Sequence, residues 1–104
     1  MEHTRKVHFQ APMTAPRIEF DLEVMAWYIR FKTGKVAKTI SEEALGYVYA
    51  IDLDAAGAVI GFELLGVRNF SLGMLLKNPT IDFSRTDLMR AEIVPASRKE
   101  LVQA

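Results

Sequence analysis

Residues 25–32 alternate apolar and polar side chains, and this alternation restricts the possible fold more than any other feature of the chain. Successive side chains of an extended strand point to opposite faces, so a period of two places every second residue on the same face. That face carries the large apolar residues Met25, Trp27, Ile29 and Phe31. Aromatic and β-branched side chains also favour a strand over a helix. The segment therefore predicts a β-strand that presents one continuous apolar row to a core.

Four further strands are predicted from similar patterns. They cover residues 17–21, 36–41, 47–53 and 58–65. A Thr-Gly-Lys break at residues 33–35 supplies the glycine that a tight hairpin needs. Another break runs from Asp54 to Gly57 and fits a type I turn closed by a glycine bulge. Because links this short cannot cross over to a parallel neighbour, we expect an antiparallel meander.

The two ends of the chain have a different character. Residues 1–16 contain two prolines and no periodic pattern, which predicts a flexible N-terminal arm. Residues 67–104 read as a C-terminal extension, in which the spacing of Phe70, Met74 and Leu75 predicts a short helix.

A second short helix is predicted to begin at the Ser-Arg-Thr-Asp run of residues 84–87, which resembles a capping box, and to reach residue 93. The expected fold class is therefore mainly β, or β-rich α+β. It consists of a five-stranded antiparallel meander over residues 17–66, followed by one or two short C-terminal helices.

Two of the predicted strands are apolar on both faces, at residues 47–51 and 59–65. A sheet with two apolar faces needs two covers. One amphipathic helix cannot hide both faces, and a large exposed apolar patch is unusual for a monomer. The sequence therefore predicts a homo-oligomer, most simply a two-fold dimer.

The amino-acid composition limits the functions that this chain can have. The chain has no cysteine, which removes disulfides and thiol catalysis and makes the cytoplasm the expected location. Thirteen basic residues balance thirteen acidic ones, which argues against a general nucleic-acid binder. There is no apolar run of about 18 residues that could span a membrane. Phosphate-loop and nucleophile-elbow motifs are also absent from the sequence, so we predict no catalytic residue and no cofactor.

Three stretches of residues 17–66 match a known pattern. FDLEVMAWYI begins at Phe20, a Gly-Lys turn follows at residues 34–35, and DLDAAGAVIGFELL runs from Asp52 to Leu65. In this order they resemble the small bacterial domain-of-unknown-function family 2283. That family typically reads Tyr-Asp-x-x-Ala-Asp-x-x-Tyr-Ile, a Gly-Lys turn, and Asp-x-Asp-x-x-Gly-x-x-x-Gly-Ile-Glu-Ile-Leu.

The family has no established activity that the resemblance could imply for this chain, and what it implies is a partner-binding role. Some members look as if they sit beside small toxin-like proteins, which implies an antitoxin-like role. One residue departs from the pattern, since Met25 stands where the family has an acidic side chain. Residues 67–104 are longer than the tail such members usually have, so part of this protein's own function is expected there.

Three carboxylates are the candidates for chemistry. Asp52 and Asp54 lie two residues apart on one strand and so share a face, and Glu63 lies on the next strand. Hard cations such as Mg²⁺ or Ca²⁺ bind clustered carboxylates, so the three residues are a possible metal site. The simpler interpretation is that Asp54 caps its turn while Asp52 and Glu63 face solvent. We favour that interpretation and predict no metal site.

The aromatic side chains are candidates for contacts with other molecules. Four aromatic residues could stack on RNA bases from a sheet face: Tyr28, Tyr47, Tyr49 and Trp27. That mode requires basic neighbours, and residues 17–66 are acidic. Packing in a core or an interface is the stronger interpretation. The interface candidates are Tyr28, Tyr47, Tyr49, Phe70 and Met74.

Two functional hypotheses follow. The first is a non-catalytic, self-associating protein-interaction module that holds an unknown protein partner, as an antitoxin-like protein or another regulator from a mobile element would. The alternative is a small enzyme or a ligand-binding or metal-binding domain that uses Asp52, Asp54 and Glu63.

Overall fold

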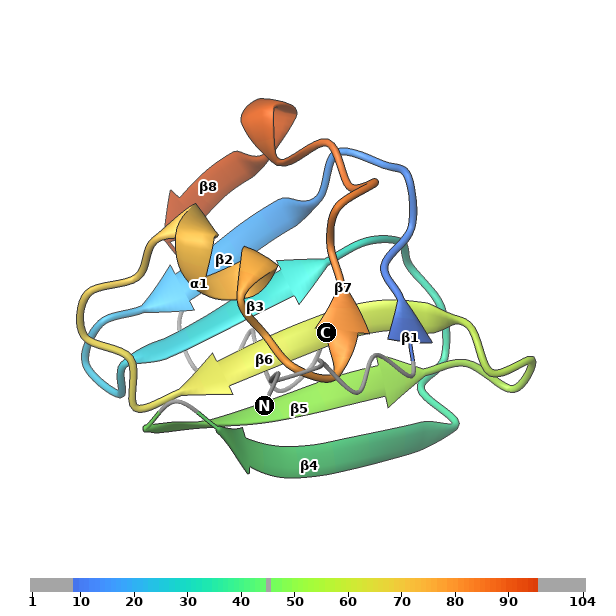
Figure 1. The fold of residues 1–104 in the computed structure, drawn as a ribbon, viewed down its shortest axis with the longest axis horizontal. Coiled ribbons are helices and arrows are strands. Elements are labelled where there is room, and N and C mark those ends of the chain that lie inside the picture. Colours follow the sequence, from blue (N-terminus) through green and yellow to red (C-terminus); the bar gives the residue numbers. More distant parts are fainter. Residues whose placement is uncertain (1–8, 45, 96–104) are drawn as a thin grey trace, which may run out of the picture.

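The computed structural model describes residues 9–44 and 46–95, in which a six-stranded sheet forms the body of the molecule (Figure 1). Its strands are β2 (Arg17–Asp21), β3 (Ala26–Arg30), β4 (Lys38–Ala44), β5 (Tyr47–Leu53), β6 (Val59–Leu65) and β8 (Glu92–Pro95). They lie in the order β4-β5-β6-β3-β2-β8, and all neighbours are antiparallel except β2 and β8. The β-rich fold class with short helices near the C-terminus is therefore confirmed.

The strand order differs from a simple meander at one point. Strand β3 pairs with β6 and not with β4, so β3 to β6 form a Greek key. The predicted hairpin at Gly34 is wrong, because residues 31–37 form a link that carries the chain from β3 to the far edge of the sheet. At its ends Phe31 N donates to Ile60 O (3.0 Å) and Ala37 N donates to Leu53 O (2.8 Å).

The pairing of β3 with β6 brings the most apolar strands of the chain together. Ile29 lies opposite Phe62, and Trp27 lies opposite Leu64. The isoleucine, the phenylalanine and the leucine are fully buried. A β3–β4 hairpin would have placed the polar strand β4 beside this row instead, so burial of apolar area favours the observed order.

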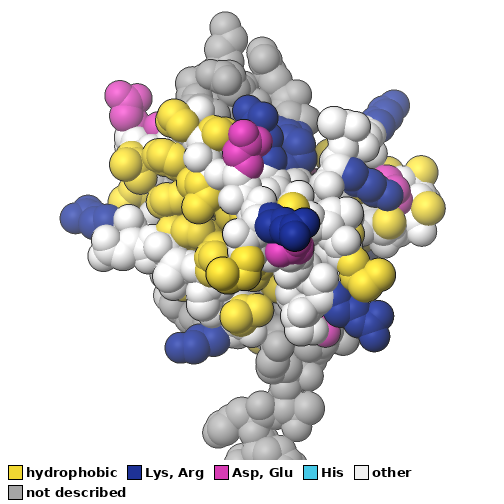
Figure 2. Space-filling model, turned by 90° about the horizontal axis from the view of Figure 1, so that it is seen from above, with side chains coloured by type: hydrophobic (Ala, Val, Ile, Leu, Met, Phe, Trp, Pro, Cys, Tyr) yellow, Lys and Arg dark blue, Asp and Glu magenta, His cyan; other side chains and the backbone are white. Residues whose placement is uncertain are grey.

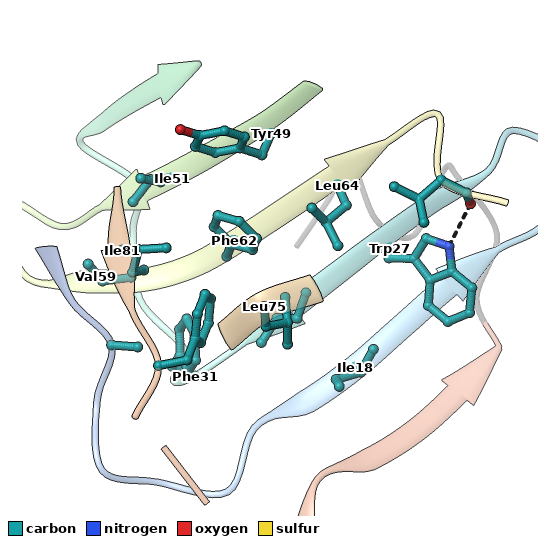
Figure 3. Packing of buried hydrophobic residues seen from close by; sticks show 14 of the residues in the cluster. Ile18, Trp27, Phe31, Tyr49, Ile51, Val59, Phe62, Leu64, Leu75 and Ile81 are labelled. Atoms are coloured by element: carbon teal, nitrogen blue, oxygen red, sulfur yellow. Dashed lines mark hydrogen bonds between the residues drawn. The ribbon is translucent and has the colours of Figure 1, made fainter. Parts of the chain in front are cut away.

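The core lies between one face of the sheet and a thin second layer (Figure 1). That layer consists of α1 (Leu72–Leu76) and of a parallel pair formed by β1 (Phe9–Gln10) and β7 (Ile81–Asp82). From the sheet the buried cluster takes Ile18, Ile51, Val59, Phe62 and Leu64, and from the second layer it takes Leu75 and Ile81 (Figure 3).

Aromatic contacts tie the C-terminal half to the sheet. The Trp27 Nε1–H group donates to Val67 O at 3.0 Å (Figure 3). The indole also stacks on Phe70, with ring centroids 4.5 Å apart. Phe83 packs against Phe62, with centroids 5.2 Å apart. Since residues 67–83 close the core in this way, they are part of the same folded unit as the sheet.

The predicted flexible arm does not describe residues 9–16. Phe9 N donates to Thr80 O (3.2 Å) and Ala11 N to Asp82 O (2.9 Å), and the side chains of Ala11 and Pro16 are buried. The rest of that arm, residues 1–8, lies outside the described residues.

The second predicted C-terminal helix, over residues 84–93, is mostly a turn and ends in a strand. Only Leu88–Arg90 forms a 3-10 helix, and the chain then extends as β8, which pairs in parallel with β2. Ile93 lies beside Ile18, and a helix at this position would leave the backbone edge of β2 without the partners that β8 supplies. Residues 96–104 of the predicted extension lie outside the described residues.

Met25 does not start the apolar row, as its place in the alternation predicts, but lies in the turn between β2 and β3. It adopts a left-handed conformation with φ = 54°, which Asn, Asp and Gly reach more readily than Met. Its carbonyl oxygen accepts hydrogen bonds from Gly66 N (3.0 Å) and Val67 N (3.3 Å), which hold the turn against the end of β6. The apolar row therefore begins at Trp27.

In the described part of the chain no helix has the length and hydrophobicity that crossing a bilayer requires.

We expect Phe83→Ala to lower the free energy of unfolding by about 3–5 kcal/mol, because Phe83 is buried and its loss opens a cavity against Phe62. Met89→Ala is the matched control, since Met89 is 91% exposed and its replacement should change stability by less than about 0.5 kcal/mol. Urea denaturation measures both variants. Equal stability of the two would show that residues 67–91 do not close the core.

Candidate functional site

The sheet has an outer face on the side opposite the second layer. Residues that alternate with the core residues of each strand point to this face. One row of this face, read across the strands from β2 to β4, is Arg17, Arg30, Gly61, Asp52 and Thr39. The outer face of β5 and β6 is mixed, because the apolar Val48, Ala50 and Leu65 alternate with core residues and lie there beside the polar residues. Leu65 packs against a small second cluster of Ala26 and Tyr28.

Tyr28 is the central side chain of the outer face and is buried. Its ring lies over Gly61, where a Cβ atom would collide with the ring and the hydroxyl. The hydroxyl donates to Asp52 Oδ2 (2.7 Å), and Thr39 Oγ1 donates to Asp52 Oδ1 (2.7 Å). Both carboxylate oxygens of Asp52 therefore serve to connect β3, β4 and β5.

Burial raises the pKa of Tyr28 well above its ordinary value, and the hydrogen bond to the Asp52 carboxylate raises this pKa further. The Arg30 guanidinium lies 5.0 Å from the ring centroid and opposes the shift. The tyrosine therefore stays a hydrogen-bond donor throughout the neutral range.

Glu19 forms ion pairs with both arginines of this row, Arg17 and Arg30. Its Oε1 pairs with Arg30 Nη2 (2.8 Å) and its Oε2 with Arg17 Nε (3.0 Å). Arg17 also approaches Glu92 of β8 at 3.7 Å. These ion pairs connect β8, β2 and β3, while the Tyr28–Asp52 contact continues the connection to β5.

The turn between β5 and β6 has the predicted form. Asp54 Oδ1 accepts hydrogen bonds from Ala56 N and Ala58 N, both at 2.9 Å, and Gly57 adopts φ = 86°. These backbone N–H groups, first of all that of Ala58, lower the pKa of Asp54. Asp54 therefore acts as a turn residue, as the simpler interpretation of the sequence proposed.

The structure does not bring the three candidate carboxylates together. Asp52 is held by Tyr28 and Thr39, Asp54 lies in the turn, and Glu63 lies between Tyr28 and Ala50 on the outer face. Over residues 9–44 and 46–95, no three His, Cys, Asp or Glu residues form a group suited to a metal ion. The described residues therefore contain no cation site of the kind that the alternative, metal-binding hypothesis requires.

The predicted interface candidates on β5 are core residues. The hydroxyl of Tyr49 lies 2.6 Å from Thr80 Oγ1 and donates to Glu42 Oε1 (2.8 Å), while Tyr47 accepts from Asn78 Nδ2 (3.3 Å). Phe70 and Met74 are partly buried against the same core, and Tyr28 is buried on the outer face. A role for these five residues in an interface stays a prediction.

Asn78 is a structural residue that the sequence analysis missed. It is fully buried, and its Oδ1 accepts hydrogen bonds from Thr80 N (3.0 Å) and Ile81 N (3.2 Å). The Asn-Pro pair at residues 78–79 is typical of a turn. The hydrogen bond between Asn78 and Tyr47, however, joins residues 31 positions apart, so no local sequence pattern indicates it.

Strand β4, which was predicted over residues 36–41, lies at the edge of the sheet, a position that the sequence analysis missed. It pairs with β5 along its whole length, from Lys38 opposite Leu53 to Ala44 opposite Tyr47, without a register shift. On its other side no described strand pairs with it, and it forms the lower margin of the sheet in Figure 1. We call this side the open edge; it is seven residues long and contains neither Pro nor Gly.

An apolar patch is exposed at the opposite end of the sheet. It includes Leu22 and Val24 of the β2–β3 turn and Ile93 of β8, of which Leu22 is 60% and Ile93 51% exposed. Figure 2 shows apolar side chains gathered on the side of the molecule where Figure 1 places this turn and the end of β8. The molecule therefore offers two different surfaces for contacts, an open edge and an apolar patch.

Comparison of the chain with models of protein families, with curated proteins and with solved structures found no match.

We expect Gly61→Ala to lower the free energy of unfolding by about 1–3 kcal/mol, since the new methyl group displaces the Tyr28 ring. In a Tyr28→Ala background the same change should be neutral or stabilising, because alanine costs less conformational entropy than glycine in a strand. A double-mutant cycle measures this coupling. Additive effects would show that Tyr28 does not lie over Gly61.

The stability of the protein should fall as the pH rises above about 10, the pKa of an unperturbed tyrosine. The folded-state pKa of Tyr28 is raised, so its contribution is complete below the unfolded pKa and is lost as the pH climbs through the folded pKa. Tyr28→Phe removes this titration but leaves Tyr49 and the lysines in place. The stability difference between the wild type and this variant should therefore shrink between neutral and strongly alkaline pH, and a constant difference would contradict the assignment.

Proposed function

We propose that this protein is a non-catalytic protein-interaction module that self-associates through the open edge of its sheet. The observation that carries the proposal is β4, a seven-residue edge strand in unbroken register whose outer side has no partner among the described residues. An edge strand presents unpaired backbone N–H and C=O groups that readily pair with another strand. A second copy of the chain offers an identical strand, so the contact closes as a two-fold dimer.

The opposite edge is a poorer site for strand addition. Strand β8 has four residues and ends at Pro95, which has no N–H group to donate. Its pairing with β2 is parallel, and parallel ladders are slightly less stable per residue than antiparallel ones. These differences favour β4 as the strand that pairs between copies.

The roles of the carboxylates support a non-catalytic function. Asp52 and Asp54 accept hydrogen bonds that hold the sheet and its turn, and Glu19 pairs with two arginines. An acid–base catalyst instead needs a carboxyl group available to a substrate. In this proposal the acidic residues of the sheet are structural.

Capture of a second protein is the finer part of the proposal. The apolar patch around Leu22 and Ile93 is available for such a partner, because exposed apolar surface commonly marks an interaction site. An antitoxin-like role in the cytoplasm, as the resemblance to family 2283 implies, belongs to this part of the proposal.

We expect static light scattering to give a mass of twice 11.7 kDa at high protein concentration and dissociation on dilution. Ser41→Lys combined with Glu43→Lys should abolish the dimer, because both side chains are exposed on β4 and the added charges repel those of a second copy. Ile93→Lys places a charge on β8 and in the apolar patch, so it should leave the dimer intact.

A monomer at every concentration would overturn the self-association. Loss of the dimer in Ile93→Lys, with retention in the β4 variant, would assign self-association to the β8 end of the molecule instead. Circular dichroism and thermal melting of both variants serve as folding controls.

A further inference from the structure

We infer that the partner at the open edge is a second β4 strand in one defined register, antiparallel and centred on Ile40. The inference rests on the proposed self-association and adds which residues meet across the contact. Lys38 of each copy then lies opposite Glu42 of the other, Thr39 lies opposite Ser41, and the two Ile40 side chains face each other.

Symmetry leaves few possible registers. A two-fold axis perpendicular to the sheet turns each face onto itself, so residues that lie opposite one another must belong to the same face. Lys38, Ile40 and Glu42 alternate with Thr39 and Ser41 along β4, so the axis has to pass through a residue and not between two residues. Ser41 is the middle residue of β4, and Ile40 and Glu42 flank it at equal distance. An axis at Glu42 would bring the two Glu42 carboxylates face to face, so Ile40 and Ser41 remain as the possible centres.

Charge decides between these two centres. With the axis at Ile40, the oppositely charged residues Lys38 and Glu42 become direct cross-strand pairs, twice in each dimer. With the axis at Ser41, Lys38 would face Ala44 and the carboxylate of Glu42 would face Ile40. That second arrangement leaves the charges unpaired across the contact and places a carboxylate against an apolar side chain, so it is disfavoured.

Apolar and hydroxyl contacts favour the same centre. Ile40 is partly buried against the core, and a second Ile40 directly opposite would extend that apolar contact across the two-fold axis. On the outer face, Thr39 and Ser41 are both exposed and would meet as a pair of hydroxyl side chains. All five positions from 38 to 42 thus acquire a complementary neighbour in this register.

Glu42 is already oriented for such a contact. Its Oε1 accepts hydrogen bonds from Tyr49 (2.8 Å) and Thr80 (2.9 Å), which fix the carboxylate beside the strand. A carboxylate has about four acceptor positions, so it can also accept a bond from Lys38 of a second copy. Because the group is held in place, forming the pair costs less side-chain entropy than it would for a free glutamate.

Cysteine cross-linking tests the register directly, because the native chain has no cysteine. Residues directly opposite in an antiparallel pair have Cβ atoms about 4.5–5.5 Å apart, within reach of a disulfide after a small adjustment. Ile40→Cys should therefore form a covalent dimer under mild oxidation. Ser41→Cys should not, because each Ser41 lies diagonally from its copy at about 7–8 Å.

A charge reversal provides the second test. Lys38→Glu places like charges opposite Glu42 in both pairs, so the dimer dissociation constant should rise by about tenfold or more. Lys35→Glu is the matched control, since it makes the same charge change at an exposed residue outside β4 and should leave the constant unchanged.

The outcomes separate this inference from the proposed function. A dimer in light scattering that cross-links in the Ser41→Cys variant, or in neither cysteine variant, would overturn the register and leave self-association intact. An unchanged dissociation constant in Lys38→Glu would do the same. A native chain that stays monomeric would overturn both.

Discussion

The pairing of β3 with β6 is the constraint on which the rest of the structure depends. It places Ile29 and Phe62 opposite each other at the centre of the sheet, where both are fully buried. A chain that joins β3 to β6 through two intervening strands has to carry β4 to the far side of β5. The open edge is therefore a consequence of the same pairing that builds the core, because a simple meander would have enclosed β4 between two neighbours.

The two faces of the sheet are stabilised in different ways. On the core side, the second layer of α1, β1 and β7 covers a continuous cluster of apolar residues, so burial of apolar surface dominates. On the outer face, the buried Tyr28 ring lies over Gly61, and hydrogen bonds to Asp52 join the strands. In the described residues, no buried side-chain nitrogen or oxygen lacks a partner. The outer face thus satisfies its polar groups without a second apolar layer.

Features of the fold that depend on neighbouring residues, such as strand bounds and a turn, were predicted from local sequence patterns. The bounds expected for β2 and β5 coincide with the observed strands, and Asp54 caps the turn that Gly57 completes. These features depend on alternation within one strand or on hydrogen bonds over a few residues.

What the sequence did not predict depends on contacts between distant residues. Alternation shows that β3 has an apolar face, but it does not identify β6 as the neighbour, since β4 follows sooner in the chain. Residues 84–95 carry a helix-start pattern, yet pairing with β2 holds the last four of them as a strand. The partners of Asp52 lie 13 and 24 positions away, so no spacing rule connects them. Tertiary pairing overrides the local preference in each case.

Charged residues on an edge strand usually protect it from pairing with other chains, and β4 carries Lys38, Glu42 and Glu43. Such charges repel a copy only when like signs come together. Antiparallel pairing about a two-fold axis reverses the order of residues, so a lysine near one end of the strand meets a glutamate near the other end of its copy. Lys38 and Glu42 stand at equal distances from Ile40, which makes the edge complementary to itself in one register and mismatched in its neighbours. The same charges that guard the edge against unrelated strands would therefore select a second copy of this chain.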